Sequence, residues 1–546
     1  MRSPAVLTAT TAALLAFTAV GASAVSFLGN DHQYKADGVQ ASATAPATAL
    51  ASVPCVDGKA DTFACDGFDL LGFVPDDSMI TYRDPLTSCA LDIAVDVLDG
   101  TPGATNPSCL LDQTGLSDIW GWTSPTTGDE FVLFGKTNGT AIYNITDPTD
   151  PEYYGEIPTI AGTLLWHDIK VFGDHAYIAS ESVGAGIVVF DLTQLDSMSA
   201  AAFPFFPIAP TNRFVPNGSD LTDTSVHNLV IDTDNGILYL VGGNAGIVIG
   251  GVCDGGLYAM DLNQSLTNPP FLGCFAAAPT VETVDGAEVT TDNAYTHDAQ
   301  CAAYIGPDTD YAGKDICVVA NEEIIAWVDV TDPTAMTEIS RISYGFVSYA
   351  HQGWMSEDQT VYFHGDELDE LDFPEDVSNT RTIVVDMSDL DNPVLDFIES
   401  HDTVSIDHNM YTHNGLLYQS NYTAGLRVFD VRDLSGTLDA DMLTEVAFFD
   451  TYPDDDDAPV TEFNGTWSVY PYFASGTIAV TGIGEGLFLL GTIEDEQVAA
   501  PTPTPTPTPD DEVKSAVLAN TGGGAAALAA VALGAAAVLR RRRDQD

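Results

Sequence analysis

Basic residues are scarce in this chain. It has 17 Lys and Arg residues against 80 Asp and Glu residues in a length of 546, which gives a formal net charge of −63 at pH 7. A surface of that sign repels phosphate backbones, so we expect no nucleic-acid partner. An acidic surface suited to saline surroundings explains the charge better than any one acidic binding site.

Motifs of common catalytic sites are also missing. The chain contains no Gly-x-Ser-x-Gly, no phosphate-binding glycine loop and no His-Glu-x-x-His, so no motif supports nucleophilic or zinc-protease chemistry. Its cysteines never stand in the close Cys-x-x-Cys spacing of zinc and redox sites. Enzymatic activity stays open, with a non-catalytic role favoured.

The N-terminus carries the pattern of an export signal. Arg2 is followed by an apolar stretch from about Ala5 to Val20 and by small residues up to Ala24. This order predicts a signal peptide over residues 1–24, with the mature chain beginning at Val25. A membrane anchor is the alternative, but the apolar stretch is short for one.

The C-terminus carries a second signal. A Pro-Thr repeat within residues 493–517 precedes Leu-Ala-Asn-Thr-Gly, and residues 518–546 continue with an Ala-rich apolar stretch and four arginines. The order resembles a sortase sorting signal, which implies that sortase cleaves between Thr521 and Gly522 and joins Thr521 to the peptidoglycan. We therefore expect an extracellular, wall-attached protein with a transient membrane span and an extended Pro-Thr linker. An ordinary tail anchor is the alternative.

Export makes disulfides the expected state of the cysteines, which number eight. Neighbours in the sequence form the simplest local loops, and the connectivity is otherwise open. The expected pairs are Cys55 with Cys65, Cys89 with Cys109, Cys253 with Cys274 and Cys301 with Cys317, the last two being favoured.

An internal repeat occupies residues 113–492. Short β-branched and aromatic runs recur between turn residues, and helical periodicity is nearly absent, which predicts an all-β region. Six runs end in Asp or Asn, and a seventh, residues 486–490, does not; the six end at Asn144, Asp191, Asp261, Asp329, Asp386 and Asp430.

A marked residue opens the strand pair ahead of each run. Two units carry Trp there, Trp120 and Trp467, and five carry a histidine at intervals of 54 to 70 residues. These five are His167, His227, His297, His351 and His408. Seven units at this period predict a seven-bladed β-propeller, with a sandwich or solenoid as the alternative.

Residues 25–112 read as an N-terminal arm held by disulfides. The last unit of the repeat supplies about three strands and needs a fourth. Residues Phe68 to Phe73 could supply that strand and close the ring, which would remove the exposed sheet edges.

Residues from about Cys65 to Leu490 resemble the LVIVD-repeat proteins of the bacterial choice-of-anchor B family. The most specific segments are Ser117–Trp122, Tyr295–Cys301, His351–Trp354, Asp366–Glu370, Asp407–Asn409 and Trp467–Pro471. The resemblance implies a propeller displayed on the cell surface by one of several anchors, and it implies no activity. His167 departs from the family pattern, in which Arg is usual at that position.

If the marked strand is the innermost of each blade, the histidines gather at one end of the channel. We expect His227, His297, His351 and His408, with His167 as the weakest member, to converge there and to bind a divalent metal such as Zn, Ni, Cu or Fe. Neighbouring carboxylates could orient the rings or coordinate directly; these are Asp118, Asp168, Asp298 and Asp407. The structural alternative is that the repeated residue only hydrogen-bonds the adjacent blade.

A run of acidic residues forms a second candidate site. Asp366, Glu367, Asp369 and Glu370 could bind Ca²⁺, but we favour an acidic surface loop as the explanation.

Two functions follow. The first is a wall-anchored binding module that recognises an unknown extracellular ligand, and the second is a metal-dependent hydrolase or oxidoreductase at the channel. We favour the first.

Overall fold

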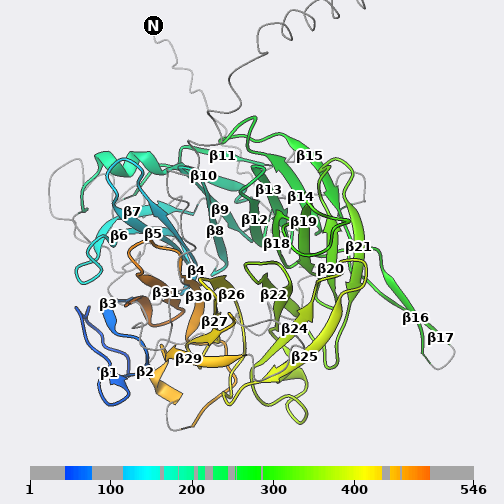
Figure 1. The fold of residues 1–546 in the computed structure, drawn as a ribbon. Helices are drawn as coiled ribbons and strands as arrows, with labels where there is room; N and C mark the ends of the chain where they lie inside the picture. Colours follow the sequence, from blue (N-terminus) through cyan, green and yellow to red (C-terminus); the bar gives the residue numbers. More distant parts are fainter. Residues whose placement is uncertain are drawn as a thin grey trace, which may run out of the picture. The chain divides into compact units, whose positions relative to one another are not determined.

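The computed structural model describes residues 44–76, 115–159, 165–182, 184–201, 207–215, 225–243, 253, 255–284, 287–432, 443–455 and 458–491. Within these ranges, seven antiparallel sheets surround a central channel (Figure 1). This confirms the predicted all-β, seven-bladed β-propeller.

Several predictions lie outside the described residues. They concern the signal peptide, the pair Cys89 and Cys109, the linker over residues 493–517, and Thr521 and Gly522. In the part that the structure describes, no helix is both long and apolar enough to cross a membrane.

The first strand of each blade faces the channel. These seven strands contact one another in a closed ring, the last touching the first, so they are the innermost strands (Figure 1). They are β4 (Leu116–Thr123), β8 (His167–Phe172), β12 (Asn228–Asp232), β18 (Asp298–Ala303), β22 (Ala350–Met355), β26 (Met410–His413) and β30 (Thr466–Tyr470).

The remaining strands follow outward in chain order, except that the outermost strand of the last blade comes from the N-terminal arm. The second strands are β5 (Glu130–Lys136), β9 (His175–Ser180), β13 (Ile237–Val241), β19 (Asp315–Ala320), β23 (Val361–Asp366), β27 (Leu416–Ser420) and β31 (Ile478–Gly482). The third strands are β6 (Gly139–Asn144), β10 (Ile187–Asp191), β14 (Leu257–Asp261), β20 (Ile325–Asp329), β24 (Arg381–Asp386), β28 (Leu426–Asp430) and β32 (Gly486–Leu490). The outermost strands are β7 (Glu152–Pro158), β11 (Asn212–Phe214), β15 (Phe271–Phe275), β21 (Thr337–Ile342), β25 (Val394–Ser400), β29 (Thr444–Phe449) and β3 (Leu70–Pro75).

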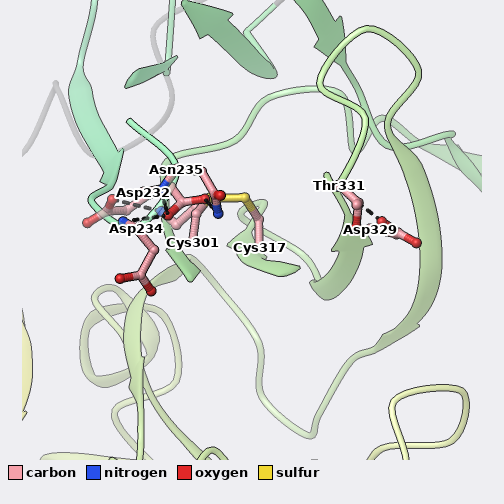
Figure 2. The surroundings of a disulfide bond; sticks show 9 residues. Asp232, Asp234, Asn235, Cys301, Cys317, Asp329 and Thr331 are labelled. Atoms are coloured by element: carbon pink, nitrogen blue, oxygen red, sulfur yellow. Dashed lines mark hydrogen bonds between the residues drawn. A yellow bond between two sulfur atoms is a disulfide. The ribbon is translucent and has the colours of Figure 1, made fainter. Parts of the chain in front are cut away.

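The recurring Asp ends the third strand of its blade, and the structure gives the reason. Its side chain accepts a hydrogen bond from the backbone amide two residues on, as Asp329 Oδ1 does from Thr331 at 3.1 Å (Figure 2). Asp261 and Asp386 make the same turn with Asn263 and Ser388. The repeat therefore marks an Asx-type turn that stops the strand.

Strand β3 closes the ring, as predicted from Phe68 to Phe73. It pairs antiparallel with β32, the third strand of the last blade. Phe73 is fully buried, and its ring lies 4.7 Å from that of Phe488, between centroids. Gly72 allows the strand to approach the first blade, because a Cβ there would lie 2.1 Å from the carbonyl oxygen of Pro148.

The N-terminal arm also extends the sixth blade. Strands β1 (Lys59–Ala60) and β2 (Phe63–Asp66) add to β29 and make that sheet six-stranded. The arm thus spans the last two blades. A hairpin of β16 (Thr280–Val284) and β17 (Ala287–Thr291) projects from the side of the molecule between the third and fourth blades (Figure 1).

Three of the four expected disulfides fall within the described residues, and all three are present. Cys55 bonds Cys65 in the arm, Cys253 bonds Cys274, and Cys301 bonds Cys317. The last pair joins directly opposed residues of β18 and β19 within the fourth blade, as predicted (Figure 2).

Candidate functional site in the central channel

Four of the five predicted histidines form a continuous row at one end of the channel. The ring centroids of His227 and His297 lie 4.3 Å apart, those of His297 and His351 4.1 Å, and those of His351 and His408 4.5 Å. All four side chains are nearly buried, because they stand where the innermost strands begin and crowd around the axis. The predicted convergence is therefore present, and metal binding stays a prediction.

His167 takes part in this arrangement only loosely. It lines the same narrow void of about 20 Å³ as the other four, but within the described residues no ring contact joins it to the row. Burial lowers the pKa of its imidazole to about 4. His167 is thus neutral near pH 7.

In His227, His297 and His408, the Nδ1 atom of the imidazole lies close to an oxygen atom. His297 Nδ1 lies 2.9 Å from the carbonyl oxygen of His351, and His408 Nδ1 lies 2.6 Å from that of Trp467. Both acceptors belong to the next blade, so the structural role considered for the repeated residue is real. In this role Nδ1 donates its proton to the carbonyl oxygen, which fixes the proton on that nitrogen.

Two glutamates complete the histidine row, and sequence reasoning did not connect them with it. Glu181 Oε1 lies 2.5 Å from Nδ1 of His227. The two oxygens of Glu367 each lie 3.5 Å from Nε2 of a histidine, Oε2 from His351 and Oε1 from His408. Neither glutamate stands at a repeated position, so the spacing of the histidines carries no signal for them.

The predicted acidic surface loop is wrong, because its residues are buried. Asp366, Glu367 and Asp369 are 0% exposed and Glu370 is 2% exposed. Asp366, at the end of β23, accepts hydrogen bonds from the Ser348 and Tyr349 amides, which folds the segment back over the channel end.

Acidic side chains outnumber basic ones around this acidic segment. Asp369, in the short helix α3 (Asp369–Asp372), forms an ion pair with Arg381. Oxygen atoms of Asp369, Glu370 and Asp407 lie within 4.8 Å of one another. Burial, followed by the carboxylates nearby, raises the pKa of Asp407 and of Glu370 well above the usual range. Calcium binding here stays a prediction.

The other carboxylates predicted beside the histidines lie one layer deeper in the channel. Asp118 and Asp168 both pair with Lys170, whose Nζ lies 3.0 Å from Asp118 Oδ2. Burial alone would lower the pKa of Lys170, but the two carboxylates outweigh it and raise that pKa well above its ordinary value. Burial raises the pKa of Asp298 to about 6. These side chains form a charged layer.

The carboxylates of Asp118 and Asp168 also join neighbouring blades, because each accepts a hydrogen bond from a backbone amide of the next blade. Asp118 Oδ2 accepts from the Ile169 amide at 3.2 Å, and Asp168 Oδ2 accepts from the Leu229 amide at 2.6 Å. Asp118 and Asp168 therefore orient the blades and Lys170 rather than the histidine rings.

Beyond the charged layer the channel widens into a cavity of about 410 Å³. Blades one, five, six and seven contribute aromatic side chains to it, and blades two to four contribute mainly aliphatic ones. The aromatic residues are Trp120, Trp354, Tyr411 and Tyr472, and the aliphatic residues are Val171, Leu229, Val230, Ile231, Ala299 and Ala302. The aromatic cluster was not predicted, although Trp120 and Trp354 lie in segments that carry the family resemblance.

A scan of this chain against models of protein families and a search of curated proteins both found no match. The resemblance to the choice-of-anchor B family therefore stays a prediction, and the function has to be argued from the channel itself.

Proposed function

We propose that this protein is an exported binding module, attached to the cell wall through Thr521, that holds an uncharged ligand with a flat ring in the wide mouth of its channel. The single observation behind the proposal is the cavity of about 410 Å³ built from the innermost strands. Its volume falls within the range of small-molecule sites, roughly 300–1,000 Å³.

The division of the cavity into two halves favours a flat ring. The rings of Trp354 and Tyr411 meet edge to face at 4.9 Å between centroids, and Trp120 and Tyr411 meet in the same way at 6.0 Å. This half offers π-faces, whereas the half that includes Val171 and Ile231 offers methyl groups. A flat apolar ring buries its surface against both.

The charged groups of the cavity favour an uncharged ligand, because they already have partners. Lys170 pairs with Asp118 and Asp168. Glu357 accepts hydrogen bonds from the backbone amides of Asn414 and Gly415. A charged ligand would lose its hydration without gaining a counter-ion here.

Two polar side chains of the cavity also have hydrogen-bond partners within the protein. Gln300 Oε1 accepts from the Met355 amide at 2.6 Å, and Gln359 Oε1 accepts from the Ile305 amide at 2.7 Å. A ligand rich in hydroxyl groups would find few open partners, so the cavity suits a mainly apolar ring.

The space at the histidine end argues against the alternative of a hydrolase or oxidoreductase. Among the described residues, the void beside the histidines measures about 20 Å³. That volume admits an ion or a water molecule, but no organic substrate.

The test is a titration of the purified protein with the neutral fluorescent probe N-phenyl-1-naphthylamine. We expect saturable binding of one probe per chain. The change Trp354→Ala should weaken it roughly tenfold, because it removes one aromatic contact surface. Phe346→Ala removes a half-exposed ring that does not line the cavity and should leave binding unchanged. Equal binding by both variants would refute the cavity as the site, and displacement of the probe by an oligosaccharide would contradict the proposed apolar ring.

A further inference from the structure

We propose that His351, His408 and Glu367 bind one four-coordinate divalent transition-metal ion at the histidine end of the channel. This inference does not depend on the ligand proposed for the opposite mouth. It rests on the spacing of three ligand groups, on the tautomer of the imidazole and on the burial of the carboxylate.

The spacing matches a tetrahedral metal site. Both Nε2-to-carboxylate distances are 3.5 Å, which is too long for a well-formed hydrogen bond. Ligand atoms about 2.0–2.1 Å from a tetrahedral ion lie about 3.3–3.4 Å from one another. Each histidine nitrogen is therefore separated from a carboxylate oxygen as two ligands of one ion would be, and the ligand atoms of all three side chains lie within 4.8 Å of one another.

The tautomer presents the nitrogen that a metal needs. Because Nδ1 of His408 donates its proton to the Trp467 carbonyl, Nε2 of the neutral ring has a lone pair, and Glu367 Oε1 lies 3.5 Å from it. A metal ion between this lone pair and the carboxylate oxygen is attracted to both of them. A backbone acceptor on the second nitrogen is also how metal-binding histidines are held in proteins.

Neighbouring side chains hold the three groups in place. The Tyr422 hydroxyl donates a hydrogen bond to Glu367 Oε1. The His297 ring lies beside that of His351 and bonds its backbone carbonyl. Such outer contacts orient ligands and strengthen metal binding.

Burial of the three groups favours a bound cation. Glu367 is 0% exposed, His351 1% and His408 3%. An ionised carboxylate away from water is costly unless a positive charge accompanies it. Two imidazoles and one carboxylate form a ligand set that suits Zn²⁺ and related ions. The adjoining void of about 20 Å³ has room for one water molecule as the fourth ligand.

The experiment strips the purified protein with a chelator and titrates it with Co²⁺, followed by Zn²⁺ in competition. We expect one Co²⁺ per chain, with the intense visible bands of a four-coordinate ion, and its displacement by Zn²⁺. His351→Gln and Glu367→Gln should each weaken Co²⁺ binding at least about tenfold, since even outer-shell losses cost that much.

The matched control is His401→Gln, which alters a half-buried histidine that follows β25 and does not line the channel. It should bind Co²⁺ as the unchanged protein does. Binding of N-phenyl-1-naphthylamine, or the circular dichroism of the β-sheet, reports whether each variant is folded. A folded protein that shows only the weak spectrum of six-coordinate Co²⁺ would overturn the proposal, as would unchanged affinity in folded His351→Gln and Glu367→Gln.

Discussion

At the scale of single residues, the surroundings of several ionisable groups shift their pKa values. His401 is a clear case. Burial, followed by the charge of Arg427, lowers the pKa of its imidazole to about 4. Its Nε2 lies 2.7 Å from the Thr382 hydroxyl, and its ring packs 4.5 Å from Phe429. The folded protein therefore keeps His401 neutral under conditions in which the unfolded chain protonates it.

This depressed pKa predicts a loss of stability in acid. The unfolded state binds a proton at His401 below about pH 6.5, and the folded state binds it only below about pH 4, so stability falls as the pH decreases between these values. The loss is on the order of 3 kcal/mol. His401→Gln should remove it. Urea unfolding of the unchanged protein and of His401→Gln at pH 7 and pH 4.5 measures the effect. The prediction is contradicted if the two proteins differ in free energy of unfolding by the same amount at both pH values.

The residue scale is also where sequence reasoning was weakest. Repetition identified His227, His297, His351 and His408, because equivalent positions in a closed ring lie at similar distances from the axis. Repetition could not identify Glu367 as part of this site, because Glu367 follows the second strand of one blade and has no equivalent in the others. The acidic segment around it was placed on the surface by the general rule for charged residues, whereas Asp366 accepts backbone hydrogen bonds that draw the segment inward.

At the scale of elements, the closing strand β3 has the largest expected effect on stability. Phe73 in this strand is fully buried and contacts both Phe63 and Phe488. Phe73→Ala should lower the free energy of unfolding by about 3–5 kcal/mol, through lost burial and the cavity left behind. Val56, which is 60% exposed, provides the control change Val56→Ala. Denaturant unfolding compares the two, and equal stabilities would show that β3 does not secure the ring.

The elements themselves were largely predictable. The strand pattern, the turn-forming Asp and the missing fourth strand of the last unit led to seven blades and to Phe68 to Phe73 as the closing segment. The addition of β1 and β2 to the sixth blade was not predicted, because two short strands carry little periodicity. Their position depends on packing among Phe63, Phe73 and Phe449 that only the folded chain reveals.

At the scale of the whole molecule, wall attachment is the property to test. Thr521→Ala removes the residue that sortase would join to peptidoglycan, so we expect the protein to leave the covalent wall fraction and to accumulate in the membrane or the medium. Extraction of cell walls with hot detergent, followed by digestion of the peptidoglycan, measures the distribution. Ser475→Ala, a change on the propeller, is the control and should leave attachment intact. An unchanged wall fraction for Thr521→Ala would rule out attachment through this threonine.

The pairing of β3 with β32 has a consequence for how the chain is made. Leu70 is paired with Leu490, so a strand synthesised early finds its partner only after the last blade has been synthesised. Contacts between such distant segments form slowly, and completion of the ring is expected to be the late step of folding. A chain that stops before residue 486 can supply neither β32 nor, further on, the threonine at residue 521. Both β32, which completes the ring, and Thr521, the proposed point of attachment, therefore lie near the C-terminus of the chain. A truncated chain can neither close its propeller nor be attached to the wall.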